Sequence, residues 1–295
     1  AVFSAPTYSA DQARLDEAKK IENQAVDLFK SNEFPEALPL FEKALRLYSE
    51  VLGERHPSTL TSLNNLAETY RNLGRHTEAL ALHEKAFRLH TEVLGERHPS
   101  TLVSLNNLAS TYRNLGRDAE ALPLVEKLLR LRTETFDERH PDTLASLNNL
   151  AATYANLGRY AEALALFEKA LQLYTEVLGE QHPDTLRSLN NLAETYNNLG
   201  RYAEALALNE KALQLYTAVL GERHPDTLRS LNNLAATYDN LGRYAEALAL
   251  HEKALRLHTE VLGERHSHTL VGLNNLAQTY NNLGRYAEAL ALNEK

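Results

Sequence analysis

The stretch that decides the fold is residues 182–223, HPDTLRSLNNLAETYNNLGRYAEALALNEKALQLYTAVLGER, because nearly the same 42 residues recur along most of the chain. One histidine opens each copy, at His56, His98, His140, His182, His224 and His266. Glycines recur near the middle and the end of the copies, except that Asp137 stands where the later glycine is expected. Such repetition is typical of arrays in which each copy is one supersecondary unit stacked on its neighbours.

Each copy contains two helical patterns. In the second copy, apolar residues separated by steps of three and four share one helix face: Leu102, Leu105, Leu108, Ala109 and Tyr112. This pattern predicts a first helix over about 99–115 and, after a turn at Gly116, a second helix over about 119–135. The second helix is apolar over close to half of its circumference, so it needs cover from more than one neighbour. A stack of helical hairpins provides that cover.

The residues of the unit resemble a known family. The run Leu66-Ala67-x-x-Tyr70, followed by Gly74 and then Glu78-Ala79-Leu80, is similar to the tetratricopeptide repeat. The segments LGERHPDTL, SLNNLA and GRYAEAL resemble the 42-residue repeats of the kinesin light chain, and similar arrays occur in bacterial regulatory proteins. The resemblance covers roughly residues 14–295. It implies an all-α, right-handed superhelical solenoid of antiparallel helix hairpins.

The period predicts the domain organisation. We expect a flexible N-terminal arm over residues 1–13, whose Phe3 and Tyr8 are possible anchors in a groove of the same chain, and a solenoid over residues 14–295. Its expected units are 14–55, 56–97, 98–139, 140–181, 182–223, 224–265 and a truncated 266–295. The close likeness of the copies also fits a designed consensus array, although Phe136-Asp137 and Gly272 are irregularities that a designer has little reason to include.

Composition excludes several classes of function. The chain has 295 residues, no cysteine and a formal net charge of −8, which argues against a protein that grips nucleic acid through clustered Lys and Arg. No run of about 18 apolar residues is present, so no transmembrane helix is expected. We therefore expect a cytoplasmic protein that binds neither nucleic acid nor membrane and needs no cofactor.

The face of the first helix opposite its leucines carries two asparagine series. In tetratricopeptide arrays the first helices line the concave surface, so the resemblance places these asparagines in a groove, where their amides can both donate to and accept from a peptide backbone. The alternative is that they bond between neighbouring helices and order the stack. The first series is Asn64, Asn106, Asn148, Asn190, Asn232 and Asn274; the second is Asn72, Asn114, Asn156, Asn198, Asn240 and Asn282.

Positions that differ between the copies are candidates for specificity. Arginines that could receive carboxylates occupy four of them: Arg71, Arg113, Arg187 and Arg229. Ala145, Ala152 and Ala155 leave a small-residue gap that could admit a bulky side chain. These features agree with the kinesin light chain, whose arrays take peptides with an aromatic residue among acidic ones. Pairing between neighbouring copies, for example of Glu194 with Arg229, is the alternative.

Metal binding and catalysis find no support. His83-Glu84 and His251-Glu252 resemble the start of a zinc-protease motif, but the next histidines, His90 and His258, come seven residues after the first ones. That is about 10 Å along a helix, too far to share one zinc ion. We expect these histidines to be packing sites, the His-Pro histidines to serve the turn, and the loop arginines of the Arg75 series to bond helix carbonyls or neighbouring glutamates.

The sequence therefore predicts a protein-binding scaffold, not an enzyme, which holds an extended peptide in its groove and whose arginines favour acidic ligands. The alternative is a spacer or self-assembly module that stacks end to end through its truncated repeat.

Overall fold

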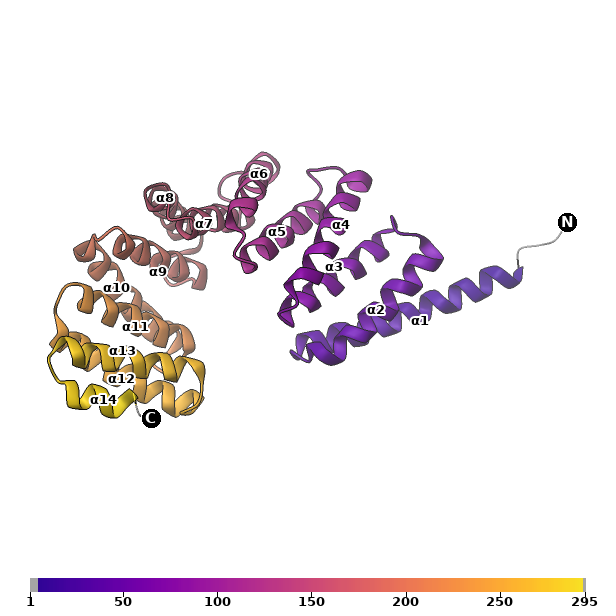
Figure 1. Ribbon diagram of the computed structural model, residues 1–295. Coiled ribbons are helices and arrows are strands. Elements are labelled where there is room, and N and C mark those ends of the chain that lie inside the picture. The colour runs from indigo at the N-terminus through magenta and orange to yellow at the C-terminus, as the bar shows by residue number, and fades with distance from the viewer. Residues whose placement is uncertain (1–4, 294–295) are drawn as a thin grey trace. The chain divides into compact units, whose positions relative to one another are not determined.

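The computed structural model describes residues 5–293, and this part of the chain is all-α, as the period predicts. Its helices follow one another as antiparallel hairpins (Figure 1). They are α1 (Ala5–Lys30), α2 (Phe34–Leu52), α3 (Pro57–Asn72), α4 (His76–Leu94), α5 (Pro99–Asn114), α6 (Asp118–Phe136), α7 (Pro141–Asn156), α8 (Tyr160–Leu178), α9 (Pro183–Asn198), α10 (Tyr202–Leu220), α11 (Pro225–Asn240), α12 (Tyr244–Leu262), α13 (Ser267–Asn282) and α14 (Tyr286–Asn293). The helices predicted over 99–115 and 119–135 are α5 and α6.

The N-terminal segment differs from the expectation. Helix α1 begins at Ala5, so residues 5–13 of the expected flexible arm are helical. The segment contains no glycine, and Pro6 lies in the first helical turn, where a proline costs no hydrogen bond. Phe3 lies outside the described residues, and so does the side chain of Tyr8.

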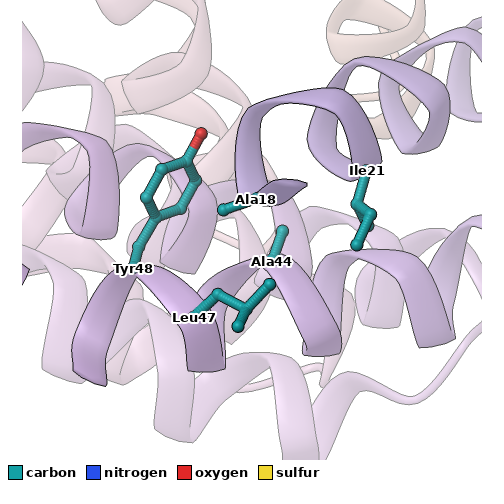
Figure 2. Close-up of a cluster of buried hydrophobic side chains, with 5 residues drawn as sticks. All are labelled: Ala18, Ile21, Ala44, Leu47 and Tyr48. Atoms are coloured by element: carbon teal, nitrogen blue, oxygen red, sulfur yellow. The ribbon is translucent and has the colours of Figure 1, made fainter. Parts of the chain in front are cut away.

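The chain divides into two compact units, residues 1–146 and 147–295. In the first unit, one core cluster joins the two helices of the first hairpin. Figure 2 shows its side chains, Ala18 and Ile21 from α1 with Ala44, Leu47 and Tyr48 from α2, all of them at most 9% exposed. The small residues let the two helices approach closely, while Leu47 and Ile21 supply the apolar area that drives packing.

In the second unit, the core shows how one hairpin stacks on the next. Ala151 of α7, Ala163 and Phe167 of α8 and Leu192 of α9 form one buried cluster, so the second helix of a hairpin contacts the first helices of its own and the following hairpin. This is the double cover that its wide apolar arc requires. Burial of a side chain such as Phe167 contributes roughly 1.5–3 kcal/mol.

The opening histidine of each copy caps the first helix. His182 precedes α9, and its Nδ1 accepts a hydrogen bond of 3.2 Å from the backbone N–H of Asp184. This acceptor satisfies one of the N–H groups that a helix leaves unpaired at its start, and Pro183 in the first turn has no N–H to leave unpaired. The same bond occurs at His56, His98, His140, His224 and His266, which confirms the predicted role in the turn.

The second helices end at a residue with positive φ, a glycine in most copies. Asp137 occupies this place after α6 with φ 99° and ψ 174°, a conformation that favours glycine. Its carboxylate Oδ1 accepts from the N–H groups of Arg139 at 2.7 Å and His140 at 3.0 Å, which stabilises the strained turn.

The loop arginines bond to glutamates, one of the two alternatives predicted for them. Arg201 lies 4.5 Å from the ring centroid of Tyr196 and donates to Glu204 at 2.9 Å, while the Tyr196 hydroxyl donates to Glu168 at 2.6 Å. This combination recurs around Tyr70, Tyr112, Tyr238 and Tyr280. It joins the loop of one hairpin to the second helix of the hairpin before it.

Within residues 5–293, no helix combines the length and apolar character needed to cross a membrane.

Candidate functional site

The second asparagine series lies at the C-terminal ends of the first helices, with exposed side chains. Its described members are exposed in both units: Asn72, Asn114, Asn156, Asn198, Asn240 and Asn282. We call this surface of the first helices the first-helix face. These side chains are accessible to solvent, as an open binding surface requires, although Asn72 Nδ2 also donates to Glu68 O at 2.8 Å and Asn282 Oδ1 accepts from Gln278 at 3.1 Å.

The first asparagine series is mostly covered. Asn64 exchanges hydrogen bonds with Ser104 of α5, at 3.2 and 3.4 Å, and therefore joins neighbouring first helices. Asn148 and Asn190 are only 6% and 3% exposed. Asn106 and Asn232 are half-buried, and Asn274 is exposed. The hydrogen bonds between Asn64 and Ser104 join neighbouring first helices, which is the alternative to peptide binding that the sequence left open for this series.

The four arginines considered for carboxylate binding each have an acidic neighbour in the chain. Arg71 donates to Glu68 through Nε and Nη2, and the Nε of Arg113 lies 3.9 Å from Asp118 Oδ1. Burial lowers the pKa of Arg113. Arg187 and Arg229 pair one turn back along their own helices, at 2.7 Å from Asp184 and 3.0 Å from Asp226. Arg229 thus pairs within α11 and not with Glu194.

A polar cluster in the first unit extends from Arg71 into the core. His83 is fully buried, with Nδ1 at 2.8 Å from Thr111 Oγ1 and Nε2 at 3.3 Å from Glu68 Oε1. Burial raises the pKa of the Glu68 carboxyl, but its hydrogen bonds with His83 and Arg71 outweigh this effect and leave the pKa below its usual range. The cluster fills the space between α3, α4 and α5.

Two equivalent places in the second unit are also filled by polar side chains. Between α9, α10 and α11, the amides of Asn197 and Asn209 both donate to Thr237 Oγ1, at 2.8 and 2.9 Å. Between α11, α12 and α13, His251 Nε2 lies 2.8 Å from Asp239 Oδ2. The hydroxyl of Thr279 lies 3.2 Å from both oxygens of the same carboxylate.

The corresponding place between α7, α8 and α9 is open. Here the two inward positions hold Ala155 and Phe167, and a hollow of about 440 Å³ results. Ala152, Ala155 and Phe167 supply its apolar lining. The remaining lining residues are Asn156, Tyr160, Asn191, Glu194, Thr195 and Asn198. Ala152 and Ala155 thus form the predicted small-residue gap, whereas Ala145 does not line it.

A second hollow, of about 400 Å³, lies near the N-terminal ends of α9 and α11. Its lining includes Arg187, Arg229 and Tyr216, with His224 at the helix start. The side chains of both arginines are 52% exposed, so each keeps donors toward solvent besides those that meet its aspartate.

The buried histidines of the second helices occupy packing positions. His251 is 2% exposed, and His90 and His258 are 4% and 2% exposed. Burial lowers the pKa of His90 and of His258. Among the described residues, no group of three or more potential ligands is placed to hold a metal ion.

Sequence reasoning missed the pairing between the first-helix position and the buried second-helix position. The available signal was their variation between copies: Arg71 with His83, which both contact Glu68, Arg113 with Val125, Ala155 with Phe167, Asn197 with Asn209, and Asp239 with His251. Each position was interpreted separately, so the link between a surface residue and a core residue 12 places later went unnoticed.

Comparison with protein families gives overlapping matches to the tetratricopeptide repeat over residues 16–74, 61–134, 105–169, 142–208, 184–248 and 240–295. The chain is a tetratricopeptide repeat protein. This confirms the family that the sequence motifs indicated, and such repeats generally mediate protein binding. No curated protein matches this tetratricopeptide repeat protein.

Solved structures agree with the assignment. A crystal structure of nearly identical TPR-like repeats, assigned to a kinesin light chain of Podosopora anserina, is 32% identical. The alignment covers 70% of this chain and 98% of that one, with a TM-score of 0.61. BtubC (BKLC) from P. vanneervenii is 20% identical over 88% of this chain and 94% of its own, with a TM-score of 0.61, and shows the common fold. The repeats are thus of the kinesin light chain type, as predicted.

Proposed function

We propose that this tetratricopeptide repeat protein holds an extended peptide on the first-helix face of its second unit, across α7, α9 and α11. The exposed amides of Asn156, Asn198 and Asn240 are the observation that carries the proposal. They recur at one position per repeat, so successive amides can meet successive backbone groups of an extended chain whatever its side chains are. Equivalent contacts by Asn72 and Asn114 in the first unit belong to the same proposal.

The first asparagine series contributes less in this proposal. The Asn64–Ser104 bond and the burial of Asn148 and Asn190 support a role in packing neighbouring first helices. Burial removes these amides from the surface that a ligand reaches.

The arginine-lined hollow supports a preference for one acidic side chain. Arg187 and Arg229 lie on its wall with half-exposed side chains, and a carboxylate between them can accept from donors that their aspartates leave unused. Arg71 and Arg113 serve the same purpose in the first unit to a smaller extent, because internal carboxylates and burial hold them.

The test is selection of a random 12-residue peptide library on the purified chain, followed by titration of the enriched peptides. A variant with Asn156→Ala, Asn198→Ala and Asn240→Ala should bind them about 100-fold more weakly, because each lost hydrogen bond contributes roughly 1 kcal/mol. Gln172→Ala with Gln214→Ala removes two exposed amides from second helices and should leave affinity unchanged. Equal affinity in both variants would refute the proposal.

Self-association is the second candidate, favoured by exposed apolar residues on the last two helices. Val271, Tyr286 and Leu290 are 53%, 70% and 60% exposed. Sedimentation velocity over a range of concentrations tests it. Stacking would be supported if the sedimentation coefficient rises with concentration and the double variant Val271→Ser with Leu290→Ser abolishes this rise. A constant monomer would exclude stacking.

A further inference from the structure

The open hollow between α7, α8 and α9 has the chemistry of a pocket for a positively charged side chain. Its lining contains one carboxylate, Glu194, three asparagine amides and no Lys, Arg or His. Glu194 is exposed and forms no ion pair or hydrogen bond with the residues that the structure describes. The cationic Arg187 lies two turns away on α9, about 10 Å along the axis, and is paired with Asp184.

The floor of the hollow suits the aliphatic part of such a side chain. Ala152 and Ala155 line it with methyl groups, and the ring of Phe167, a core residue only 2% exposed, also lines it. Tyr160 also lines the hollow, and an aromatic face attracts a cation. A lysine or arginine can lay its methylene groups along this wall and bring its charged end to Glu194.

The hollow also differs from its equivalents in being unfilled. Where the neighbouring repeats place Asn197 with Asn209, or Asp239 with His251, internal polar contacts occupy the same space. At Ala155 the side chain is truncated. The hydroxyl of Thr195 donates to Asn191 O at 2.8 Å, as the equivalent Thr237 does to Asn233 O, but it accepts from no side chain that the structure describes, whereas Thr237 accepts from Asn197 and Asn209. Within the described part of the chain, no internal cation therefore meets Glu194 here.

We propose that this hollow binds a lysine or arginine side chain of the peptide held on the first-helix face. The inference rests on the proposed function and refines it: the ligand combines a basic residue here with an acidic residue at Arg187 and Arg229. The two hollows lie toward opposite ends of α9, so a peptide of uniformly acidic character would leave Glu194 facing a like charge.

The experiment uses the 12-residue library selected on the full chain. Enriched peptides should share a Lys or Arg at one fixed position, and its replacement by norleucine should weaken binding about tenfold. Glu194→Gln, the residue type found at the equivalent Gln278, should weaken the basic peptide about tenfold and the norleucine peptide less than twofold. Ala155→Arg, which reproduces Arg71 and Arg113, should fill the hollow and abolish the preference.

The control is Glu180→Gln, which removes the same charge from a loop where Glu180 pairs with Lys211 at 2.9 Å. It should leave both affinities unchanged. This inference alone is overturned if the enriched peptides depend on the asparagines but lack a basic residue. It is also overturned alone if their affinity responds equally to Glu194→Gln and Glu180→Gln. An absence of enriched peptides overturns it together with the proposed function.

Discussion

The contact between Asp239 and His251 offers a quantitative test of how surface and core positions are linked. His251 has a side chain 1% exposed, and its Nε2 lies 2.8 Å from a carboxylate that is 22% exposed. Two repeats earlier, the same two positions hold Ala155 and Phe167. We therefore expect Asp239→Ala and His251→Phe each to destabilise the protein, and the two together to be nearly harmless.

The magnitude follows from the groups left behind. Asp239→Ala leaves the buried imidazole without its acceptor, which lowers the free energy of unfolding by about 2 kcal/mol. His251→Phe leaves a partly buried carboxylate with Thr279 as its remaining partner, and the loss should also be about 2 kcal/mol. The double variant removes both polar groups and restores a combination that the chain already packs, so its loss should be about 1 kcal/mol. Additive behaviour would give about 4 kcal/mol, which makes the coupling about 3 kcal/mol.

Urea unfolding followed by circular dichroism at about pH 7.5, on the parent chain, both single variants and the double variant, measures this cycle. A double variant that is less stable than the parent chain by the sum of the two single losses would refute the link between the two positions.

Three further predictions concern stability. Asp137→Gly should be more stable than Asp137→Ala by about 1–2 kcal/mol, because alanine keeps the positive φ and loses the carboxylate acceptor; equal unfolding midpoints would contradict the strain argument. Phe167→Ala should cost about 3–5 kcal/mol in urea unfolding, since it empties the core beneath the open hollow, and a loss under about 1 kcal/mol would show that the ring is not packed. Burial lowers the pKa of His90 and His258, so the unfolded chain takes up protons first as the pH falls below about 6.5 and the folded chain loses stability there. The test replaces both histidines by Tyr, the residue found at the equivalent Tyr174. Thermal unfolding at about pH 5.5 and about pH 7.5 should show a smaller loss of stability at the lower pH in this variant than in the parent chain. An unchanged pH dependence would exclude these two groups as its source.

The sequence was sufficient to predict the all-α hairpins because repetition multiplies weak local signals. The leucines of α5, the proline in its first turn and Gly116 after it each favour the same boundaries, and the other copies repeat them. The arm over residues 1–13 was predicted incorrectly from Ala5 onward, because that segment lies outside the period and offers only local propensity.

The candidate site was predictable only in part. The gap at Ala152 and Ala155 was visible as missing side-chain volume, and it lines the open hollow. The burial of Asn190 and the pairing of Arg187 with Asp184 depend on how adjacent helices and rotamers meet, which helical spacing alone does not specify. For the same reason the place of Glu194 beside the hollow emerged only from the structure.

Photo-cross-linking of an enriched peptide tests the central claim most directly, that the ligand lies on the first-helix face. Benzoylphenylalanine would replace Ala236 on α11 in one variant and Ala207 on α10 in another, since both alanines are exposed and of equal size. We predict cross-linking of the peptide at position 236 and none at position 207. Cross-linking at 207 without cross-linking at 236 would place the ligand on the second helices and contradict the proposal.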